Sequence, residues 1–278
     1  MRVAITGANG FVGSALVRHL ENCGHQVLQW IRKPHGNRQF QFELSKPEQI
    51  PSLNGVDVLI HAAYMPYSNK HKNAFDVNVH MTQKLAELCA QNQVKFIFVS
   101  SLSAHEGATS VYGTQKLACE KVVLLHNGLV VRPGLVIGNS GLYKRIQETV
   151  QRSPVIPLID GGKQPVQIVA IADLVLAIEK CIAVDAKGIL TIATEKAYTL
   201  HEFYQIVAKS VGTKPWFVPV PYYLVYSLIW LLEKLGISLS AGTDNLKGLR
   251  ANIVHPTKDS LEKLQMQLKG LDALLQTN

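Results

Sequence analysis

The first 31 residues constrain the fold most, because a strand, a glycine-rich turn, a helix and a second strand follow one another without interruption. "RVAIT" at 2–6 is a short β-branched run typical of a strand buried on both faces. "SALVRHLEN" at 14–22 has apolar residues at helical spacing, and "QVLQWI" at 26–31 predicts the second strand. The turn contains Gly7, Gly10 and Gly13. This order is typical of the unit that holds a dinucleotide pyrophosphate at a helix N-terminus.

Further strands follow the first two at regular intervals. The apolar runs at 56–63, 95–101 and 128–138 predict buried strands, and 78–94 predicts a helix between the first two of them. Strands that alternate with helices predict an α/β fold with a doubly wound parallel sheet.

We predict two domains along the chain. Residues 1–160 should form a dinucleotide-binding domain, to which elements near 165–182 return. Residues 183–278 should form mainly a smaller C-terminal α/β substrate lobe.

Composition limits the partners. The net charge of +8 is compatible with nucleic acid, an anionic membrane surface or an anionic small molecule. The basic residues are scattered and form no stripe, which argues against nucleic acid. The four cysteines lie far apart without a Cys-x-x-Cys pair, so we expect reduced thiols and no metal site. The chain begins directly in a strand, so we expect no signal peptide and a cytoplasmic protein.

A serine, tyrosine and lysine group follows the strand at 95–101. Tyr112 and Lys116 are four residues apart, which places both on one face of a helix. A free tyrosine has a pKa of about 10, and a nearby ammonium group lowers it. Ser100, Ser101 and Ser103 offer hydroxyls at the carboxyl end of the strand, where ligands of such sheets bind. The group favours proton transfer at a carbonyl or carbinol.

Three motifs together resemble those of one family. "TGANGFVG" at 6–13, "NVHMT" at 78–82 and "RPGLVIG" at 132–138 are similar to motifs of the extended and atypical branches of the short-chain dehydrogenase/reductase superfamily, which has a Rossmann fold. The resemblance covers about residues 1–215, and the remainder loosely resembles relatives of a complex I accessory subunit and sterol-type dehydrogenases. The sequence departs from the family's pattern at Met81, where the family usually has Gly.

The resemblance implies roles for the reactive group. Tyr112 would be the general acid/base, and Lys116 would bind the ribose and adjust the tyrosine pKa. Ser101 is the best match for the ligand of the substrate oxygen, with Ser100 and Ser103 as alternatives, and Asn78 would support a proton relay. The stretch between serine and tyrosine is shorter than in many extended members, which argues against a sugar-nucleotide substrate.

The resemblance also implies a set of cofactor contacts. They are Gly7, Asn9, Gly10, Phe11, Val12, Gly13, Leu44, His61, Ala62, Ala63, Lys116 and Pro133. Ile31 occupies the position where NAD-specific members have an acid, and Arg32 and Lys33 follow it. A guanidinium there suits a 2′-phosphate, so we predict NADP, with NAD as the second choice.

Three functions remain open. The leading hypothesis is an NADP(H)-dependent oxidoreductase that acts on a carbonyl or alcohol of a small molecule. The second is a nucleotide-sugar epimerase or dehydratase that recycles its cofactor in place. The third is a non-catalytic NADPH-binding subunit or assembly protein. By analogy with the superfamily, we also expect a homodimer.

The segment 217–232, "FVPVPYYLVYSLIWLL", is unusually apolar. It is shorter than the roughly 20 apolar residues that a spanning helix needs. We predict a buried helix that caps the lobe. The alternative is an exposed apolar face that accepts a hydrophobic substrate or contacts a membrane surface.

Overall fold

The computed structural model describes residues 1–67, 71–184, 186–237 and 242–276. Its centre is a seven-stranded parallel sheet in the order β11-β6-β5-β4-β1-β2-β3. The strands are β1 (Arg2–Thr6), β2 (Gln26–Ile31), β3 (Gln39–Gln41), β4 (Val58–His61), β5 (Lys95–Val99), β6 (Leu129–Pro133) and β11 (Gly188–Ile192). The strand order reverses at β1, which creates a crevice at the carboxyl edge of the sheet.

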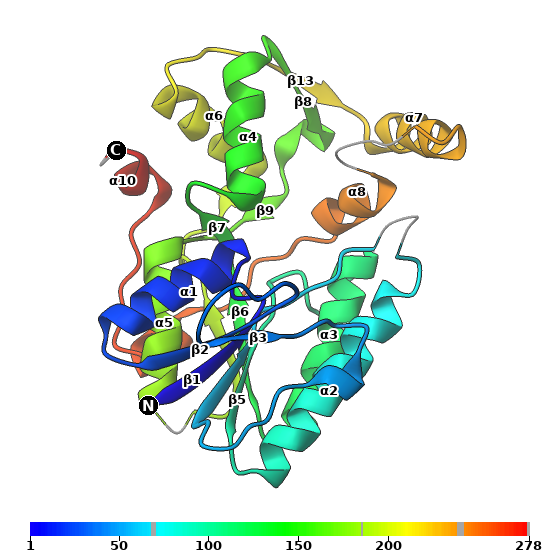
Figure 1. Cartoon of the computed structure of the whole chain (residues 1–278). Coiled ribbons are helices and arrows are strands. Elements are labelled where there is room, and N and C mark those ends of the chain that lie inside the picture. The colour runs from blue at the N-terminus through cyan, green and yellow to red at the C-terminus, as the bar shows by residue number, and fades with distance from the viewer. Residues whose placement is uncertain (68–70, 185, 238–241, 277–278) are drawn as a thin grey trace.

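Helices cover both faces of this sheet, as predicted for a doubly wound fold (Figure 1). Helices α1 (Phe11–Asn22) and α5 (Ile171–Ala183) pack against each other on one face, and α2 (Ala74–Gln91) and α3 (Val111–Leu125) on the other. Each face has its own apolar core, because successive strand residues point to opposite sides. Ile5 and Ile60 lie in the core under α1, while Leu59 and Phe98 lie in the core under α2.

A smaller lobe stands above the carboxyl edge of the sheet (Figure 1). It has its own core, formed around Tyr143, Ile156, Leu158 and Phe203. Its elements are β7 (Leu135–Ile137), α4 (Gly141–Arg152), β8 (Val155–Ile159), β9 (Pro165–Val166), β10 (Ile168–Ala170), β12 (Tyr198–Thr199), α6 (Leu200–Ser210), β13 (Trp216–Val220) and α10 (Leu271–Gln276). The lobe strands form three two-stranded sheets, β7 with β10, β8 with β13, and β9 with β12.

The chain passes between the sheet layer and the lobe several times. Residues 141–159 contribute to the lobe core, then α5 returns to the sheet layer, as the sequence suggested for 165–182. Strand β11 is an edge strand of the main sheet, and α9 (Lys258–Lys263) packs against it. The residues of the sheet-layer core and of the lobe core therefore alternate along the chain. The functional division into two domains stays a prediction.

The predicted buried helix at 217–232 is wrong in its burial. Strand β13 precedes helix α7 (Tyr222–Lys234), and Tyr222 alone among the helix residues is buried. Helix α7 rests on α8 (Thr243–Arg250) at the margin of the lobe (Figure 1). Two short 3₁₀ segments, Pro47–Gln49 and Asp160–Gly162, complete the described elements. None of the described helices is long and apolar enough to cross a membrane.

Candidate active site

The glycine turn brings the ends of β1 and β4 together at the carboxyl edge. Gly7 has φ +67°, and a Cβ on it would lie 2.8 Å from the Ala63 Cα atom and 3.2 Å from the Ala62 carbonyl carbon. A Cβ on Gly13 would lie 2.1 Å from the Gly7 oxygen. The turn therefore needs glycine at both positions, one for its conformation and one for the close approach of α1.

The first turn of α1 is open to a ligand. Gly10 is its N-cap, no side chain caps it, and no acidic residue lies in its first turn. The first backbone N–H groups of a helix have no intrahelical acceptor and attract anions. These features fit the pyrophosphate of a dinucleotide.

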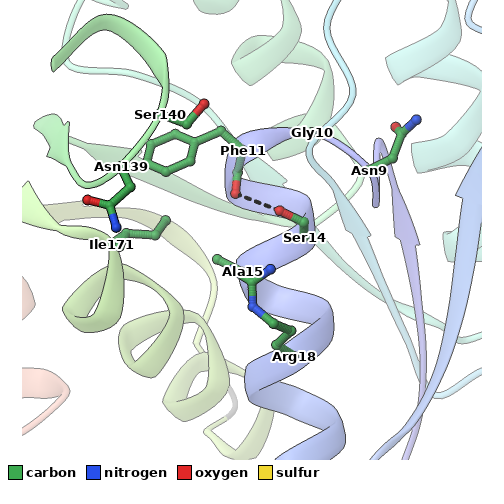
Figure 2. A pocket seen from close by; sticks show the side chains of 9 residues that line it. All are labelled: Asn9, Gly10, Phe11, Ser14, Ala15, Arg18, Asn139, Ser140 and Ile171. Atoms are coloured by element: carbon green, nitrogen blue, oxygen red, sulfur yellow. Dashed lines mark hydrogen bonds between the residues drawn. The ribbon is translucent and has the colours of Figure 1, made fainter. Parts of the chain in front are cut away.

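A cavity of about 320 Å³ lies beside this turn (Figure 2). It is lined by Asn9, Gly10, Phe11, Ser14, Ala15, Arg18, Asn139, Ser140 and Ile171. Figure 2 shows the Phe11 ring beside Asn139 and Ser140, while Arg18 projects from the next turns of α1. The side chain of Val12, another predicted cofactor residue, packs partly against the sheet core, and its contact with the cofactor stays a prediction.

His61 lies at the end of β4 and is buried. Its Nδ1 atom is 2.6 Å from the Thr6 hydroxyl, which also accepts a hydrogen bond from the Ala63 N–H at 3.2 Å. The Thr6 hydroxyl thus contacts both the histidine ring and the Ala63 backbone. Burial, with a contribution from the charge of Lys116, lowers the pKa of His61 to about 3. His61 is thus a neutral residue that joins two strand ends.

Tyr112 and Ser101 meet at the carboxyl edge of the sheet. Burial raises the pKa of Tyr112, and a hydrogen bond with the Ser101 side chain partly offsets this effect. The Ser101 hydroxyl also accepts a hydrogen bond from the Ser103 N–H at 3.2 Å. Ser100 faces the other way and donates to Glu120. Of the three candidate serines, Ser101 is therefore the one paired with the tyrosine.

Lys116 lies behind the tyrosine and is 5% exposed. Its Nζ donates to the Val99 carbonyl at 2.8 Å and lies 4.6 Å from the centroid of the Phe98 ring. Burial lowers the pKa of Lys116 to about 8, although the nearby Cys119 and Glu120 favour its charged form. The lysine is thus held by the end of β5, and its predicted role in lowering the tyrosine pKa stays a prediction.

Tyr64, which follows β4, was not predicted from the sequence. Its ring lies 5.2 Å from the Tyr112 ring, edge to face, and 5.3 Å from the Lys116 Nζ atom. Burial raises the pKa of Tyr64, with a smaller contribution from Tyr112. This second tyrosine belongs to the wall of the site.

The buried ion pair below the site was also not predicted from the sequence. Glu120 is 1% exposed and accepts hydrogen bonds from Arg132 Nε at 2.8 Å and from an Arg132 terminal nitrogen at 2.5 Å. Ser100 donates to the same carboxylate. The i+4 spacing of Lys116 and Glu120 could have suggested a helix pair, but not the partner on β6.

Asn78 uses its polar atoms on the backbone. Its Oδ1 accepts from the Met65 N–H at 2.9 Å, and its Nδ2 donates to the Met65 and Ala74 carbonyls, both at 2.8 Å. These bonds hold the loop after β4 against α2. The predicted role of Asn78 in a proton relay stays a prediction.

The remaining predicted cofactor residues surround the same edge. Arg32 and Lys33 are exposed after the end of β2, and Leu44 packs partly against the sheet core. Among the described residues, neither Arg32 nor Lys33 forms an ion pair. Pro133 is buried at the end of β6, where its carbonyl accepts from the Leu102 N–H at 3.2 Å.

Helix α8 contacts the N-terminal end of the Tyr112 helix. Its Asp244 accepts a hydrogen bond from the Val111 N–H at 2.6 Å, at the N-terminus of α3. The Thr109 hydroxyl donates to the Lys247 carbonyl at 3.2 Å. No pattern in the sequence predicted these contacts, which join residues more than 130 positions apart.

Possible metal ligands gather in one place within the described residues. His19 Nε2 lies 2.8 Å from the Glu179 carboxylate and 3.8 Å from the Cys23 sulfur, on the outer surface of α1 and α5. The hydrogen bond from histidine to glutamate joins the two helices without a metal, and the predicted absence of a metal site stays a prediction.

Comparison with known proteins agrees with this arrangement. Residues 3–193 match the model of the NAD-dependent epimerase/dehydratase family. The chain is 28% identical to a ceramide reductase of Caulobacter vibrioides over 237 residues, which are 79% of this chain and 73% of that protein. It is 26% identical to the mitochondrial NADH dehydrogenase [ubiquinone] 1 alpha subcomplex subunit 9 of Dictyostelium discoideum over 222 residues, which are 73% of this chain and 62% of that protein.

Solved structures show the same fold. A human epimerase family protein with NADPH superposes with a TM-score of 0.78 at 20% identity, covering 100% of this chain and 98% of that one. MoeE5 with UDP-glucuronic acid and NAD gives a TM-score of 0.75 at 22% identity, covering 100% of this chain and 97% of that one. Since the family match spans the sheet, the glycine turn and the Tyr112 helix, the chain belongs to the NAD-dependent epimerase/dehydratase family of the short-chain dehydrogenase/reductase superfamily.

Proposed function

We propose that this protein is an NADP(H)-dependent oxidoreductase that interconverts a carbonyl and an alcohol on a largely apolar small molecule. The observation that carries the proposal is the Tyr112–Ser101 pair at the carboxyl edge of the sheet, with Lys116 fixed behind it. A nicotinamide dinucleotide, when bound, supplies or accepts the hydride.

The chain supplies the proton and the orientation. A substrate oxygen that accepts hydrogen bonds from both hydroxyls is held where charge develops during reduction. A tyrosine phenol is protonated at neutral pH, and burial raises the pKa of Tyr112 further, so the side chain can donate a proton to that oxygen when a carbonyl is reduced.

The choice of NADP rests on the end of β2. Ile31 is buried and offers no carboxylate to a ribose hydroxyl, and Arg32 follows it with an exposed guanidinium. An unpaired guanidinium can grip a 2′-phosphate with two hydrogen bonds. Glu43 forms an ion pair with Lys46 at 2.9 Å. The hydrogen bond with Lys46 is the main cause that lowers the pKa of Glu43, and the charge of Arg32 contributes least.

The apolar substrate class has two supports. Three relatives have names that describe lipid-type molecules: ceramide reductase, sterol-4-alpha-carboxylate 3-dehydrogenase and 2-alkyl-3-oxoalkanoate reductase. The short connection between Ser101 and Tyr112 leaves little chain to contact a sugar nucleotide, as the sequence already suggested.

The test measures turnover and cofactor binding on the full chain. We expect NADPH oxidation with a 2-alkyl-3-oxoalkanoate or a ketosteroid, and a Tyr112→Phe variant whose kcat falls by about 10²-fold or more while its Kd for NADPH is unchanged. Tyr204→Phe, in the core of the lobe, should retain full turnover. Unchanged turnover by Tyr112→Phe would disprove the assigned chemistry.

Cofactor preference is tested by titration with NADPH and NADH. A preference of about 100-fold for NADPH corresponds to about 2.7 kcal/mol, and Arg32→Ala should remove most of it without changing the Kd for NADH. Tighter binding of NADH by the natural chain would contradict the role of Arg32.

Two other outcomes identify the competing functions. Conversion of a UDP-sugar without net change in nicotinamide absorbance would indicate an epimerase or dehydratase. Tight NADPH binding without turnover of any carbonyl compound would indicate a non-catalytic subunit, the class to which the names of the NADH dehydrogenase relatives point.

A further inference from the structure

Helix α7 has a stripe of leucines that nothing in the described chain covers. The stripe consists of Leu224, Leu228, Leu231 and Leu235, which are 65%, 59%, 50% and 67% exposed. Their spacing of four, three and four residues places them on one side of the helix, with Leu235 at its C-cap. Contiguous exposed leucines on a folded chain mark an interaction surface.

The opposite side of α7 is attached to the protein. Tyr222 is buried, and its N–H donates to the Asp160 carboxylate at 3.0 Å. Near the other end, Glu233 accepts hydrogen bonds from the Thr243 N–H and hydroxyl, both at 2.9 Å. The helix is therefore fixed at both ends, and its leucine stripe points away from these attachments.

Aromatic and cationic side chains flank the stripe. Lys234 Nζ lies 5.0 Å from the Trp230 ring, and the Arg250 guanidinium lies 4.4 Å from the Tyr222 ring and 5.1 Å from the Tyr223 ring. Trp230 and Tyr223 are 47% and 68% exposed. Trp and Tyr rings with a lysine of α7 and an arginine of α8 beside a row of leucines are side chains that suit the interface of a membrane.

A second exposed apolar face lies on the strand that leads into α7. Trp216 and Val218 of β13 are 78% and 40% exposed, and Trp216 pairs in register with Val155 of β8, which is 50% exposed. Because side chains alternate along a strand, these three residues share the outer face of the two-stranded sheet, while Ile156 and Leu158 point into the lobe core.

We propose that α7 docks the protein on the surface of an anionic lipid bilayer, with its leucine stripe in the headgroup region. A helix of 13 residues is about 20 Å long, too short to cross the roughly 30 Å hydrocarbon layer, so it lies along the surface. The net charge of +8 attracts anionic lipid and opposes the pairing of two copies through the same face.

The docking surface is connected to the candidate active site. Helix α7 packs on α8, and α8 caps the N-terminus of the Tyr112 helix through Asp244. A bilayer against α7 therefore lies on the side of the molecule from which an apolar substrate would approach Tyr112. The docking itself does not depend on the proposed oxidoreductase activity.

Vesicle co-sedimentation of the full chain tests the proposal. We expect the protein to pellet with mixed phosphatidylcholine–phosphatidylglycerol vesicles, and more weakly with phosphatidylcholine alone. A Leu228→Glu/Leu231→Glu variant should lose about tenfold in partition coefficient for each leucine. The matched control is Leu125→Glu, at an exposed leucine at the far end of α3, which should bind like the natural chain.

Tryptophan fluorescence gives a second readout. In a Trp216→Phe variant, Trp30 is fully buried and Trp230 is the reporter, so vesicles should shift its emission to shorter wavelength. No binding to anionic vesicles would overturn the proposal. A dimer in solution that Leu228→Glu/Leu231→Glu converts to a monomer, without vesicle binding, would assign the stripe to contact between two copies. NADPH titration of the same variants separates these outcomes from a failure of the proposed enzyme activity.

Discussion

Glu120 is the buried anion on which α3, β5 and β6 converge. Its carboxylate accepts from Ser100 and from two nitrogens of Arg132, and it lies one helical turn from Lys116. A charge that is 1% exposed is tolerated only when its oxygens are fully hydrogen-bonded. This network fixes the strand ends on which Ser101 and Lys116 depend.

Replacing Glu120 should therefore be costly. Glu120→Gln leaves the Arg132 charge without its partner, and we expect a loss of about 3 kcal/mol or more in the free energy of unfolding, measured in urea. Glu106→Gln is the control, since Glu106 and Lys121 are 81% and 62% exposed and their ion pair contributes little. Equal stability of the two variants would show that the buried network is not stabilising.

His61 makes stability depend on pH in the acid range. Its pKa is about 3 when folded and about 6.5 when unfolded, so between these values the unfolded chain binds more protons and stability falls as the pH falls. From pH 7 to pH 5 the expected loss from this residue is about 2 kcal/mol. A His61→Gln variant should show a correspondingly smaller loss by urea unfolding at the two pH values, and an identical loss would refute the buried neutral histidine.

At the scale of elements, the N-terminus of α3 is where three segments meet. Ser110 caps it by accepting from the Gly113 N–H at 3.1 Å, and Asp244 of α8 accepts from Val111. A Cβ on Gly113 would lie 2.5 Å from the Ser103 oxygen, so glycine allows the helix to approach the serine loop. The short connection between Ser101 and Tyr112 is thus a tight packing arrangement.

Asp244 should matter more than its distance in sequence suggests. Asp244→Ala removes a charged cap, and we expect a loss of about 1 kcal/mol in stability together with reduced turnover, because Tyr112 lies in the first turn of the same helix. Thermal unfolding and kcat are the measurements. Asp259→Ala, in the first turn of α9, should leave kcat unchanged. Unchanged kcat in Asp244→Ala would show that α8 does not influence the position of Tyr112.

At the scale of the whole molecule, the sheet layer is assembled from distant parts of the chain. Its core under α1 includes Leu174 and Ile178 of α5, Ile192 of β11 and Leu264 after α9. These residues follow the lobe elements at 141–159 in the chain. The core of the sheet layer is therefore completed by residues that follow the first lobe elements in the chain.

A fragment of residues 1–160 tests this point. It lacks α5 and β11, so the part of the sheet face that α5 covers beside α1 would be exposed to water, and we expect a chain without cooperative unfolding by circular dichroism and without NADPH binding. The full chain should unfold in one transition. A folded fragment that binds NADPH would instead show that residues 1–160 form the dinucleotide-binding domain without the elements at 165–182.

The sequence by itself determined the parallel sheet and the glycine turn. Strand burial, helical spacing and the need for glycine are local properties of residues 2–31 and of the strand and helix segments that follow them. It also predicted Tyr112 and Lys116 on one helix face after a strand that ends in serines, and the structure places Ser101 beside Tyr112, while their catalytic roles stay a prediction. Tertiary structure alone decided the partners Tyr64, Glu120 with Arg132, and Asp244, since their contacts join segments far apart in the chain. It also decided the exposure of α7, because hydropathy is the same whether an apolar helix is covered or not, and only packing determines which faces remain open.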